Sequence, residues 1–285
     1  MTPTPHTLLI RLEAVLQSWG IRSPYNDRDT LTRPTKSGVI GLLAAADGHD
    51  RDEHRHPGDD FLPLAELAAL RFGVRADRPG RLTCDFQTSG GGAYPLRPRD
   101  VITDPLRADR AAAALAEDQG DSFGHVAGPT LADWYSAPKN IAPHPATHTL
   151  TATNSKRHPQ ISRRWYLADA AFLAAVESTD TALLRRLADR LHTPRRLLWL
   201  GRKQCAPTQP LPHGIHPGSL HEALATTPLL PRSRPAPTTA WIEVDPGSPG
   251  ASAINDQPIS FATHSRTRAL RWEQRLSLTP PQETR

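Results

Sequence analysis

Two hydrophobic patterns follow one another at the start of the chain. From Thr7 to Leu16, apolar residues occupy every second position, which is typical of a half-buried strand. From about Ser37 to Asp47, apolar residues recur at helical spacing, which predicts a helix whose first turn Ser37 or Thr35 can cap. A strand followed by a helix therefore opens the fold.

The next segment continues this series of elements up to residue 89. Residues 47–60 are charged and show no apolar periodicity, so they predict a loop, and residues 62–70 predict a short helix. The runs RFGVRAD and RLTCDFQT are typical of strands, and the turn signal Arg78-Pro79-Gly80 joins them. The order so far is strand, helix, strand, strand.

Regular patterning is lost from Gly90 to about Gln160. This stretch is rich in Pro and Gly, with only a short Ala-rich helical patch near residues 107–117. A loop of this length inside a compact domain is usually functional or disordered. We interpret residues 90–160 as an insertion, in which Gly90–Gly92 forms a flexible root or a place of close backbone approach.

Clear patterns return after the insertion. The run ISRRWYLADAAFLAAVE predicts a strand, and LLWLG predicts a closing strand. Between them, Leu183, Leu184, Leu187 and Leu191 mark one face of a helix that Pro194 ends. Strand, helix, strand, strand, then strand, helix, strand is close to a ferredoxin-like split βαβ repeat, which is an α+β fold.

The remaining residues, 213–285, predict a small C-terminal β subdomain. The proline-rich segment Pro228–Thr239 is typical of a linker, and three strands follow at Trp241–Val244, Ile259–Thr263 and Leu270–Leu278. The predicted domains are therefore a ferredoxin-like core over residues 1–89 and 161–212, the insertion over 90–160, and this subdomain.

The charge balance favours an acidic partner. The chain has 34 Lys and Arg against 29 Asp and Glu, a net charge of +5, which promotes association with anions without specifying a fold. No apolar run is long enough to span a bilayer and the N-terminus lacks a signal-peptide pattern, so we expect a cytoplasmic protein without membrane association. The isolated Cys84 and Cys205 indicate neither a disulfide framework nor a zinc site.

The stretch RPTKSGVIGLLAAADG, Arg33–Gly48, joins basic residues to a helix N-terminus. Unpaired N–H groups and the helix dipole favour an anion there, and Lys36 and Arg33 flank it. Lys36-Ser37 resembles the end of a nucleotide-binding P-loop, but both glycines of that motif are missing, which argues against such a site. The alternative is an ordinary capped helix with a solvated lysine.

Further basic residues occur near the predicted strand ends. They are Arg22 and Arg28 before the first helix, Lys156 and Arg157 in the insertion, and Arg202 and Lys203 after the last strand of the core. On the predicted topology, the loops after the first and last strands can lie at neighbouring ends of the sheet. Several cations converging on a helix N-terminus suit a chain of phosphates better than a single phosphate.

Four motifs carry a family resemblance by their order and spacing. They are LEAVLQSWG, R-x-T-x-x-x-PTKSGVIGLLAAADG, RRWYLADAAF and LGRKQCAPTQPL, and SRTRALRWEQRL near the C-terminus fits the family's last strand. Over residues 7–212 the chain resembles the RAMP superfamily of CRISPR-associated proteins, and within it the CasD-type subunits of type I-E Cascade surveillance complexes.

The resemblance implies a fold and a function. The core would be RRM-like, a β-thumb would replace the insertion, and the chain would hold the 5′ handle of the CRISPR RNA (crRNA) without catalysis and without a cofactor. Its neighbours would be the backbone subunit CasC and the large subunit CasA, and it would meet target DNA only indirectly through the complex. A free-standing RNA-binding module is a weaker alternative.

The resemblance also implies which residues bind RNA. Gln17, Ser18 and Trp19 would shape the turn after the first strand, the loop 28–37 would lie over the handle, and LGRK would add Arg202 and Lys203. The full expected set is Gln17, Ser18, Trp19, Arg22, Arg28, Arg33, Thr35, Lys36, Ser37, Gly38, Lys156, Arg157, Arg202 and Lys203. Such residues can hold phosphates while bases are stacked or read at their edges. Core packing of Trp19, and a solvated strand end at Arg202 and Lys203, stay open as alternatives.

Histidines in two segments raise other chemistries. His49, His54 and His56 lie among acidic residues but fit no metal-ligand spacing, so a solvated loop is favoured over a metal site. In the insertion, which also holds His144 and His148, His158 with Lys156 could cleave RNA by acid–base chemistry. A metal-independent endoribonuclease that processes pre-crRNA is therefore the alternative function. Because type I-E complexes assign that cleavage to a separate subunit, the resemblance favours a chain that is not an enzyme.

Overall fold

The chain divides into two compact units. The computed structural model describes residues 4–20, 26–54, 56–89, 141–143, 146, 150–152, 160–233, 237–262 and 265–282. One unit comprises Met1–Asp85 and Arg163–Arg285, and the other Phe86–Ser162. In the second unit, β5 (Ile141–Pro143) pairs antiparallel with β6 (Leu150–Ala152). The helical patch expected at 107–117 and the root Gly90–Gly92 lie outside the described residues.

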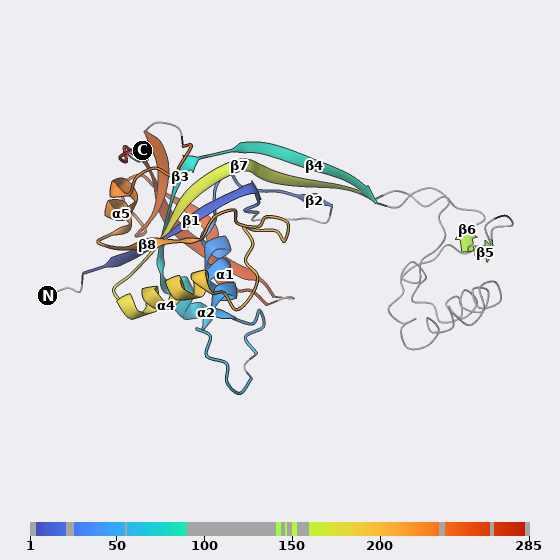
Figure 1. Cartoon of the computed structure of the whole chain (residues 1–285), viewed down its shortest axis with the longest axis horizontal. Coiled ribbons are helices and arrows are strands. Elements are labelled where there is room, and N and C mark those ends of the chain that lie inside the picture. Colours follow the sequence, from blue (N-terminus) through green and yellow to red (C-terminus); the bar gives the residue numbers. More distant parts are fainter. Residues whose placement is uncertain are drawn as a thin grey trace. The chain divides into compact units, whose positions relative to one another are not determined.

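A nine-stranded, mainly antiparallel sheet forms the framework of the larger unit (Figure 1). Its strands are β1 (His6–Gln17), β2 (Asp27–Arg28), β3 (Arg71–Arg78), β4 (Arg81–Ser89), β7 (Gln160–Ser178), β8 (Pro212–Pro217), β9 (Thr238–Val244), β10 (Ala251–Ser260) and β11 (Thr267–Leu278). The strand order is β10-β11-β9-β3-β7-β1-β8, and β2 and β4 also pair with β7.

Helices cover both faces of this sheet. On one face, α1 (Lys36–Asp47), α2 (Leu64–Ala69) and α4 (Thr181–His192) share a core with Leu8 and Leu12 of β1. On the other face, α5 (Leu220–Thr226) shares a core with Leu9. Because side chains alternate along a strand, β1 is buried on both faces rather than one. Helix α5 was not predicted from the sequence, although its Ser219-x-x-Glu222 capping box is a start signal.

Most of the predicted core elements are confirmed, but the closing strand is wrong. The LLWLG stretch, residues 197–201, is irregular, and β8 occupies the place beside β1 instead. Leu200 is buried. Its N–H donates to the carbonyl of Cys205 at 2.7 Å, so the backbone forms a turn between these two residues. Leu198 and Leu200 therefore reach the core from an irregular segment and not from a strand, while Leu197 is exposed.

The C-terminal residues extend the same sheet and are not a separate subdomain. β9 pairs with β3 in a register that places Trp241 opposite Val74, and β11 and β10 follow outward. The strands predicted at Trp241–Val244 and Leu270–Leu278 correspond to β9 and β11, whereas the one predicted at Ile259–Thr263 is wrong for most of its length, because β10 runs from Ala251 to Ser260. The segment read as a linker is anchored, since Leu229 and Leu230 are buried.

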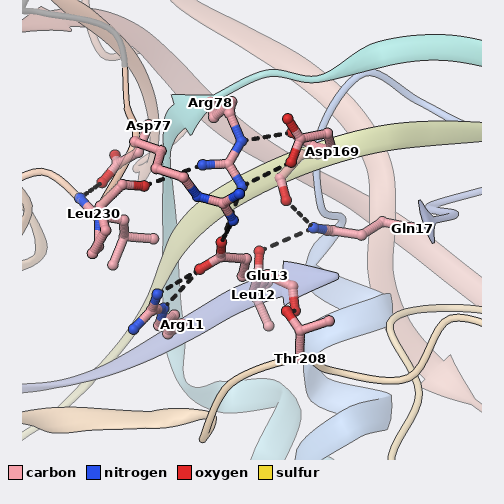
Figure 2. A network of polar contacts seen from close by, with 12 residues as sticks. Arg11, Leu12, Glu13, Gln17, Asp77, Arg78, Asp169, Thr208 and Leu230 are labelled. Carbon is pink, nitrogen blue, oxygen red and sulfur yellow. Dashed lines mark hydrogen bonds and ion pairs between the residues drawn. The ribbon is translucent and has the colours of Figure 1, made fainter. Parts of the chain in front are cut away.

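A buried ion pair on β3 holds the start of the segment Pro228–Thr239 against the sheet. The fully buried Arg75 donates to Asp77 through Nε at 2.6 Å and Nη2 at 2.8 Å, and also to the carbonyls of Thr227 and Pro228. The second oxygen of Asp77 accepts the N–H of Leu230 at 2.9 Å (Figure 2). The carbonyl groups at the end of α5 lack partners within the helix, and Arg75 thus supplies hydrogen bonds to them.

Glu13 of β1 is the centre of a neighbouring cluster. Its carboxylate accepts hydrogen bonds from Arg11 and Arg78, which Figure 2 shows converging on it, and from Arg232. Burial alone would raise the pKa of Glu13, but these hydrogen bonds outweigh it and the pKa is lowered. The cluster joins three segments that are distant in the sequence.

Candidate nucleic-acid interface

A groove of about 510 Å³ runs beside α1 in the larger unit. Its walls come from the turn after β1, residues 28–29, α1, residues 49–51, the segment 196–203, and the residues around the β10–β11 connection. Among the lining residues are seven cations against a single carboxylate, Asp29. The cations are Arg28, Arg51, Arg196, Arg202, Lys203, Arg266 and Arg268. We call this site the basic groove.

Exposure separates these cations into two groups. Five side chains are exposed and can reach a bound phosphate: Arg28, Arg51, Arg196, Lys203 and Arg266. Arg202 and Arg268 are half-buried. The guanidinium of Arg202 donates to the carbonyls of Arg28 at 2.8 Å and Trp165 at 3.1 Å, and it lies 4.7 Å from the ring centroid of Tyr166. Arg202 therefore positions the Arg28 loop, and neither Arg202 nor Lys203 belongs to a strand end.

Two of the sequence motifs meet at this site. The N–H of Ser18, in LQSWG, donates to the carbonyl of Leu200, in LGRK, at 3.0 Å. Gly201 has φ +103°, and a Cβ there would lie only 1.7 Å from the carbonyl oxygen of Ser18. Only glycine allows this close approach. The structure thus brings the loop after β1 and the LGRK turn together.

The first turn of α1 forms part of the groove wall. Thr35 is the N-cap, because its hydroxyl accepts the N–H of Gly38 at 3.1 Å, and Ser37 is not. Thr35, Ser37 and Gly38 all line the groove. A Cβ on Gly38 would lie 2.8 Å from the Trp19 ring, so this glycine is needed for packing against Trp19. A larger residue at Gly38 would therefore disturb the packing against Trp19.

Lys36, in contrast, is not part of the groove surface. Its side chain is only 2% exposed, and Nζ lies 2.9 Å from Glu243 Oε2. Burial lowers the pKa of Lys36, and Glu243 opposes that effect in part. Both interpretations of this residue, a phosphate contact and a solvated lysine, required an exposed ammonium group. Neither fits its position.

Arg33 is likewise turned into the protein. Its guanidinium pairs with Glu273 and lies 4.7 Å from the ring centroid of Trp241, and its side chain is 13% exposed. Burial, with the nearby cation Arg271, lowers the pKa of Arg33 to about 10. Arg33 does not line the basic groove.

Lys36 and Arg33 belong to one network of buried charges, which we call the α1 ion network. Asp256 accepts the backbone N–H of Lys36 at 2.8 Å and Nε of Arg271 at 2.6 Å. Arg271 Nη2 also donates to Glu273 at 2.9 Å. The network pairs three cations, Arg33, Lys36 and Arg271, with three carboxylates, Glu243, Asp256 and Glu273. It ties the start of α1 to the C-terminal strands.

Gln17 and Trp19 are both buried, and of the two only Trp19 lines the basic groove. The amide of the fully buried Gln17 donates to the carbonyls of Leu12 at 3.0 Å and Ala170 at 2.8 Å (Figure 2), and its oxygen accepts from the Trp19 indole at 3.0 Å. Trp19 is 2% exposed. Of the two alternatives for Trp19, core packing is therefore the one that the structure supports.

Several groove residues were not predicted from the sequence. Arg51, Arg196, Arg266 and Arg268 supply cations, and the half-buried Trp199 and Phe261 supply aromatic side chains. The available signals were the basic runs TPRRLLW and SRTRALR. Nothing in either run showed that it would face the same groove as the α1 N-terminus.

Some predicted residues lie outside the described part of the chain. They are Arg22, Lys156 and Arg157, together with His144, His148 and His158. Of the other histidines, His54 and His56 are exposed, but His49 is 4% exposed, with its ring 4.9 Å from that of Phe61. The solvated-loop interpretation was therefore wrong for His49. Among the described residues, no group of His, Cys, Asp and Glu is placed to hold a metal ion.

Comparisons with known proteins point to one family. The family described as CRISPR-associated protein (Cas_Cas5) matches residues 7–273. The CRISPR system Cascade subunit CasD of Escherichia coli (strain K12) is 26% identical over 206 residues, which cover 72% of this chain and 68% of that protein. No helix in the described ranges is long and apolar enough to cross a membrane.

Two solved structures agree with this assignment. The first, described as the crystal structure of a Cas protein, is 30% identical with a TM-score of 0.59, over 97% of this chain and 98% of that one. The second, described as a CRISPR RNA-guided surveillance complex, is 26% identical with a TM-score of 0.63, over 96% of this chain and 91% of that one. Since the family match spans nearly the whole sequence, this chain belongs to the Cas_Cas5 family of CRISPR-associated proteins.

Proposed function

We propose that this chain is the non-catalytic crRNA-binding subunit of a type I-E Cascade surveillance complex and that its basic groove holds the 5′ handle of the guide RNA. The observation that carries the proposal is the groove itself, where seven cations face one carboxylate. The likeness to a protein named as a Cascade subunit supports the assembly. CasC and CasA are the proposed neighbours, and target DNA is met indirectly.

The chemistry of the groove suits a single strand. Phosphates of a splayed RNA can be held by exposed Arg and Lys side chains, while bases stack on aromatic rings. Arg196, Lys203 and Arg266 offer exposed charge, and Trp199 and Phe261 offer rings. A groove of this composition favours several successive nucleotides over one small anion.

The topology supports a ferredoxin-like RAMP core. The elements β1, α1, β3, β7, α4 and β8 follow one another along the chain, and the four strands lie in the order β3-β7-β1-β8. This order supports the split βαβ arrangement, with β8 and not residues 197–201 as the closing strand. β9, β10 and β11 add three further strands beyond β3.

RNA cleavage distinguishes this proposal from its alternative. The purified chain is incubated, without metal, with unprocessed repeat RNA and with a single-stranded RNA that carries the handle. We expect binding of the handle RNA and no cut in either RNA. Site-specific cleavage that His158→Ala abolishes would establish the endoribonuclease and overturn the non-catalytic proposal.

Purification of the tagged chain from its host should yield a stable complex with a guide RNA. Recovery of the chain alone would favour a free-standing module.

A matched pair of lysine variants tests which cations meet the RNA. Lys36→Met should lower the free energy of unfolding by about 1–3 kcal/mol, because it leaves the carboxylate of Glu243 without its ion-pair partner. Lys203→Met should change stability by less than about 0.5 kcal/mol, since this side chain is exposed. Urea denaturation measures both values.

RNA affinity should show the opposite ranking. Lys203→Met should make the slope of log K against log salt shallower by about 0.7, the single-strand value for one phosphate contact. Folded Lys36→Met protein should keep the wild-type slope. A shallower slope for Lys36→Met with unchanged stability would mean that Lys36 reaches the RNA after all.

A further inference from the structure

A second hollow, of about 470 Å³, lies on the face of the sheet that α1 covers. Ala76, Thr239, Trp241 and Arg275 form its floor. They share one face because Ala76 pairs with Thr239 and Trp241 pairs with Arg275 across neighbouring strands. Its size falls in the range of roughly 300–1,000 Å³ that is usual for ligand sites. We call it the sheet hollow.

The sheet hollow carries positive charge that the protein does not neutralise. Arg275 is exposed, and its side chain makes no hydrogen bond or ion pair with any residue in the described ranges. The one carboxylate that lines the hollow, Asp77, is bound on both oxygens by the buried Arg75. Arg275 also contributes to lowering the pKa of the nearby Arg33, after burial and Arg271. An anion in the hollow would relieve this crowding of cations.

Hydroxyl and aromatic groups complete the lining. Thr32 and Thr239 bring hydroxyl groups, and the half-buried indole of Trp241 forms a wall on which Arg33 is stacked. A guanidinium and hydroxyls suit a phosphate and a sugar, and an indole suits the apolar part of a nucleotide. A carboxylate-rich ligand would use the arginine but leave the aromatic wall without a role.

The sheet hollow and the basic groove share the loop that leads into α1. Asp29 and Thr35 line the groove, whereas Thr32, midway between them, lines the hollow. Three residues span no more than about 10 Å even when fully extended. A strand of RNA that leaves the groove over this loop therefore reaches the hollow in a short step.

We propose that the sheet hollow binds a nucleotide of the same single-stranded RNA, adjacent to the segment in the basic groove, with its phosphate on Arg275. This inference rests on the proposed function, because it assumes that the groove holds RNA. It adds an RNA contact at Arg275, a residue of the motif SRTRALRWEQRL to which the sequence analysis gave no role in RNA binding.

RNA length separates the two sites. Wild type, Arg275→Ala and the control Arg185→Ala are compared against single-stranded handle RNAs that are lengthened stepwise at either end. Arg185 is exposed on α4 and lines neither site. Below a threshold length all three proteins should bind equally. Beyond it, Arg275→Ala should lose about tenfold in affinity, the value for one charged hydrogen bond, with a salt slope shallower by about 0.7. Arg275→Lys should restore the slope because it keeps the charge.

The outcomes distinguish this inference from the function on which it rests. Wild-type affinity for Arg275→Ala at every length would overturn the sheet hollow as an RNA site while leaving the groove intact. An equal loss at every length would also overturn it, because Arg275 would then act on the groove. If RNA binding is unchanged but the tagged variant no longer recovers its neighbouring proteins, the hollow takes a protein and the inference is wrong. Failure of the wild type to bind any handle RNA would instead refute the proposed function.

Discussion

Replacing Asp256 with alanine should lower the free energy of unfolding by about 3–5 kcal/mol, the usual cost of breaking a buried ion pair from one side. Asp256 is fully buried and accepts hydrogen bonds from Arg271 at 2.6 Å and from the N–H of Lys36 at 2.8 Å. Without this carboxylate, Arg271 keeps only Glu273, and the first N–H of α1 has no acceptor. The loss arises from charges left without partners more than from the contact itself.

Urea denaturation of the full chain measures the loss, with Asp245→Ala as the matched control. Asp245 is exposed in the turn after β9 and should cost less than about 0.5 kcal/mol. A double-mutant cycle with Arg271→Ala gives the coupling between the two side chains, which we expect to be strongly favourable. A cost for Asp256→Ala below about 1 kcal/mol would show that the α1 ion network does not hold the C-terminal strands to α1.

The triple variant Arg196→Ala, Lys203→Ala, Arg266→Ala should weaken binding of handle RNA by about a thousandfold at low salt. All three side chains are exposed and line the basic groove from two different segments. Each charged contact contributes roughly 1.5 kcal/mol, which is about tenfold in affinity. The slope of log K against log salt should become shallower by about 2, the value for three single-strand contacts.

The control carries the same change in net charge at sites outside the groove. Arg71, Arg81 and Arg185 are exposed and line neither the groove nor the sheet hollow. Their triple alanine variant should keep the wild-type salt slope. Equal losses in the two triple variants would mean that only overall charge attracts the RNA, and the groove would lose its role. Melting temperatures of both variants check that the fold is retained.

Local patterns predicted most elements of the core correctly. The alternation from Thr7 to Leu16 and the helical spacing from Ser37 to Asp47 correspond to β1 and α1. The leucines of α4 face the core as their spacing required. These predictions succeeded because the period of side chains along a strand or a helix depends on backbone geometry alone.

Burial of charge could not be predicted in the same way. Lys36 and Lys203 each lie in a basic, turn-forming stretch, yet Lys36 is buried against Glu243 and Lys203 is exposed at the groove. The difference comes from β9, β10 and β11, whose carboxylates lie more than 200 residues away along the chain. No local pattern reports such a partner.

The amino-acid sequence alone specifies the order of the main strands and helices, the basic character of the chain and, through its motifs, the family. Which cations line the basic groove, in contrast, depends on which loops the fold brings together. Gly201 allows the LGRK turn to approach Ser18, and the β10–β11 hairpin brings Arg266 to the same groove. The same hairpin carries Asp256 and Arg271, which hold the start of α1 in place. Long-range pairing of strands, and not local propensity, therefore separates the buried cations that stabilise the fold from the exposed cations of the basic groove.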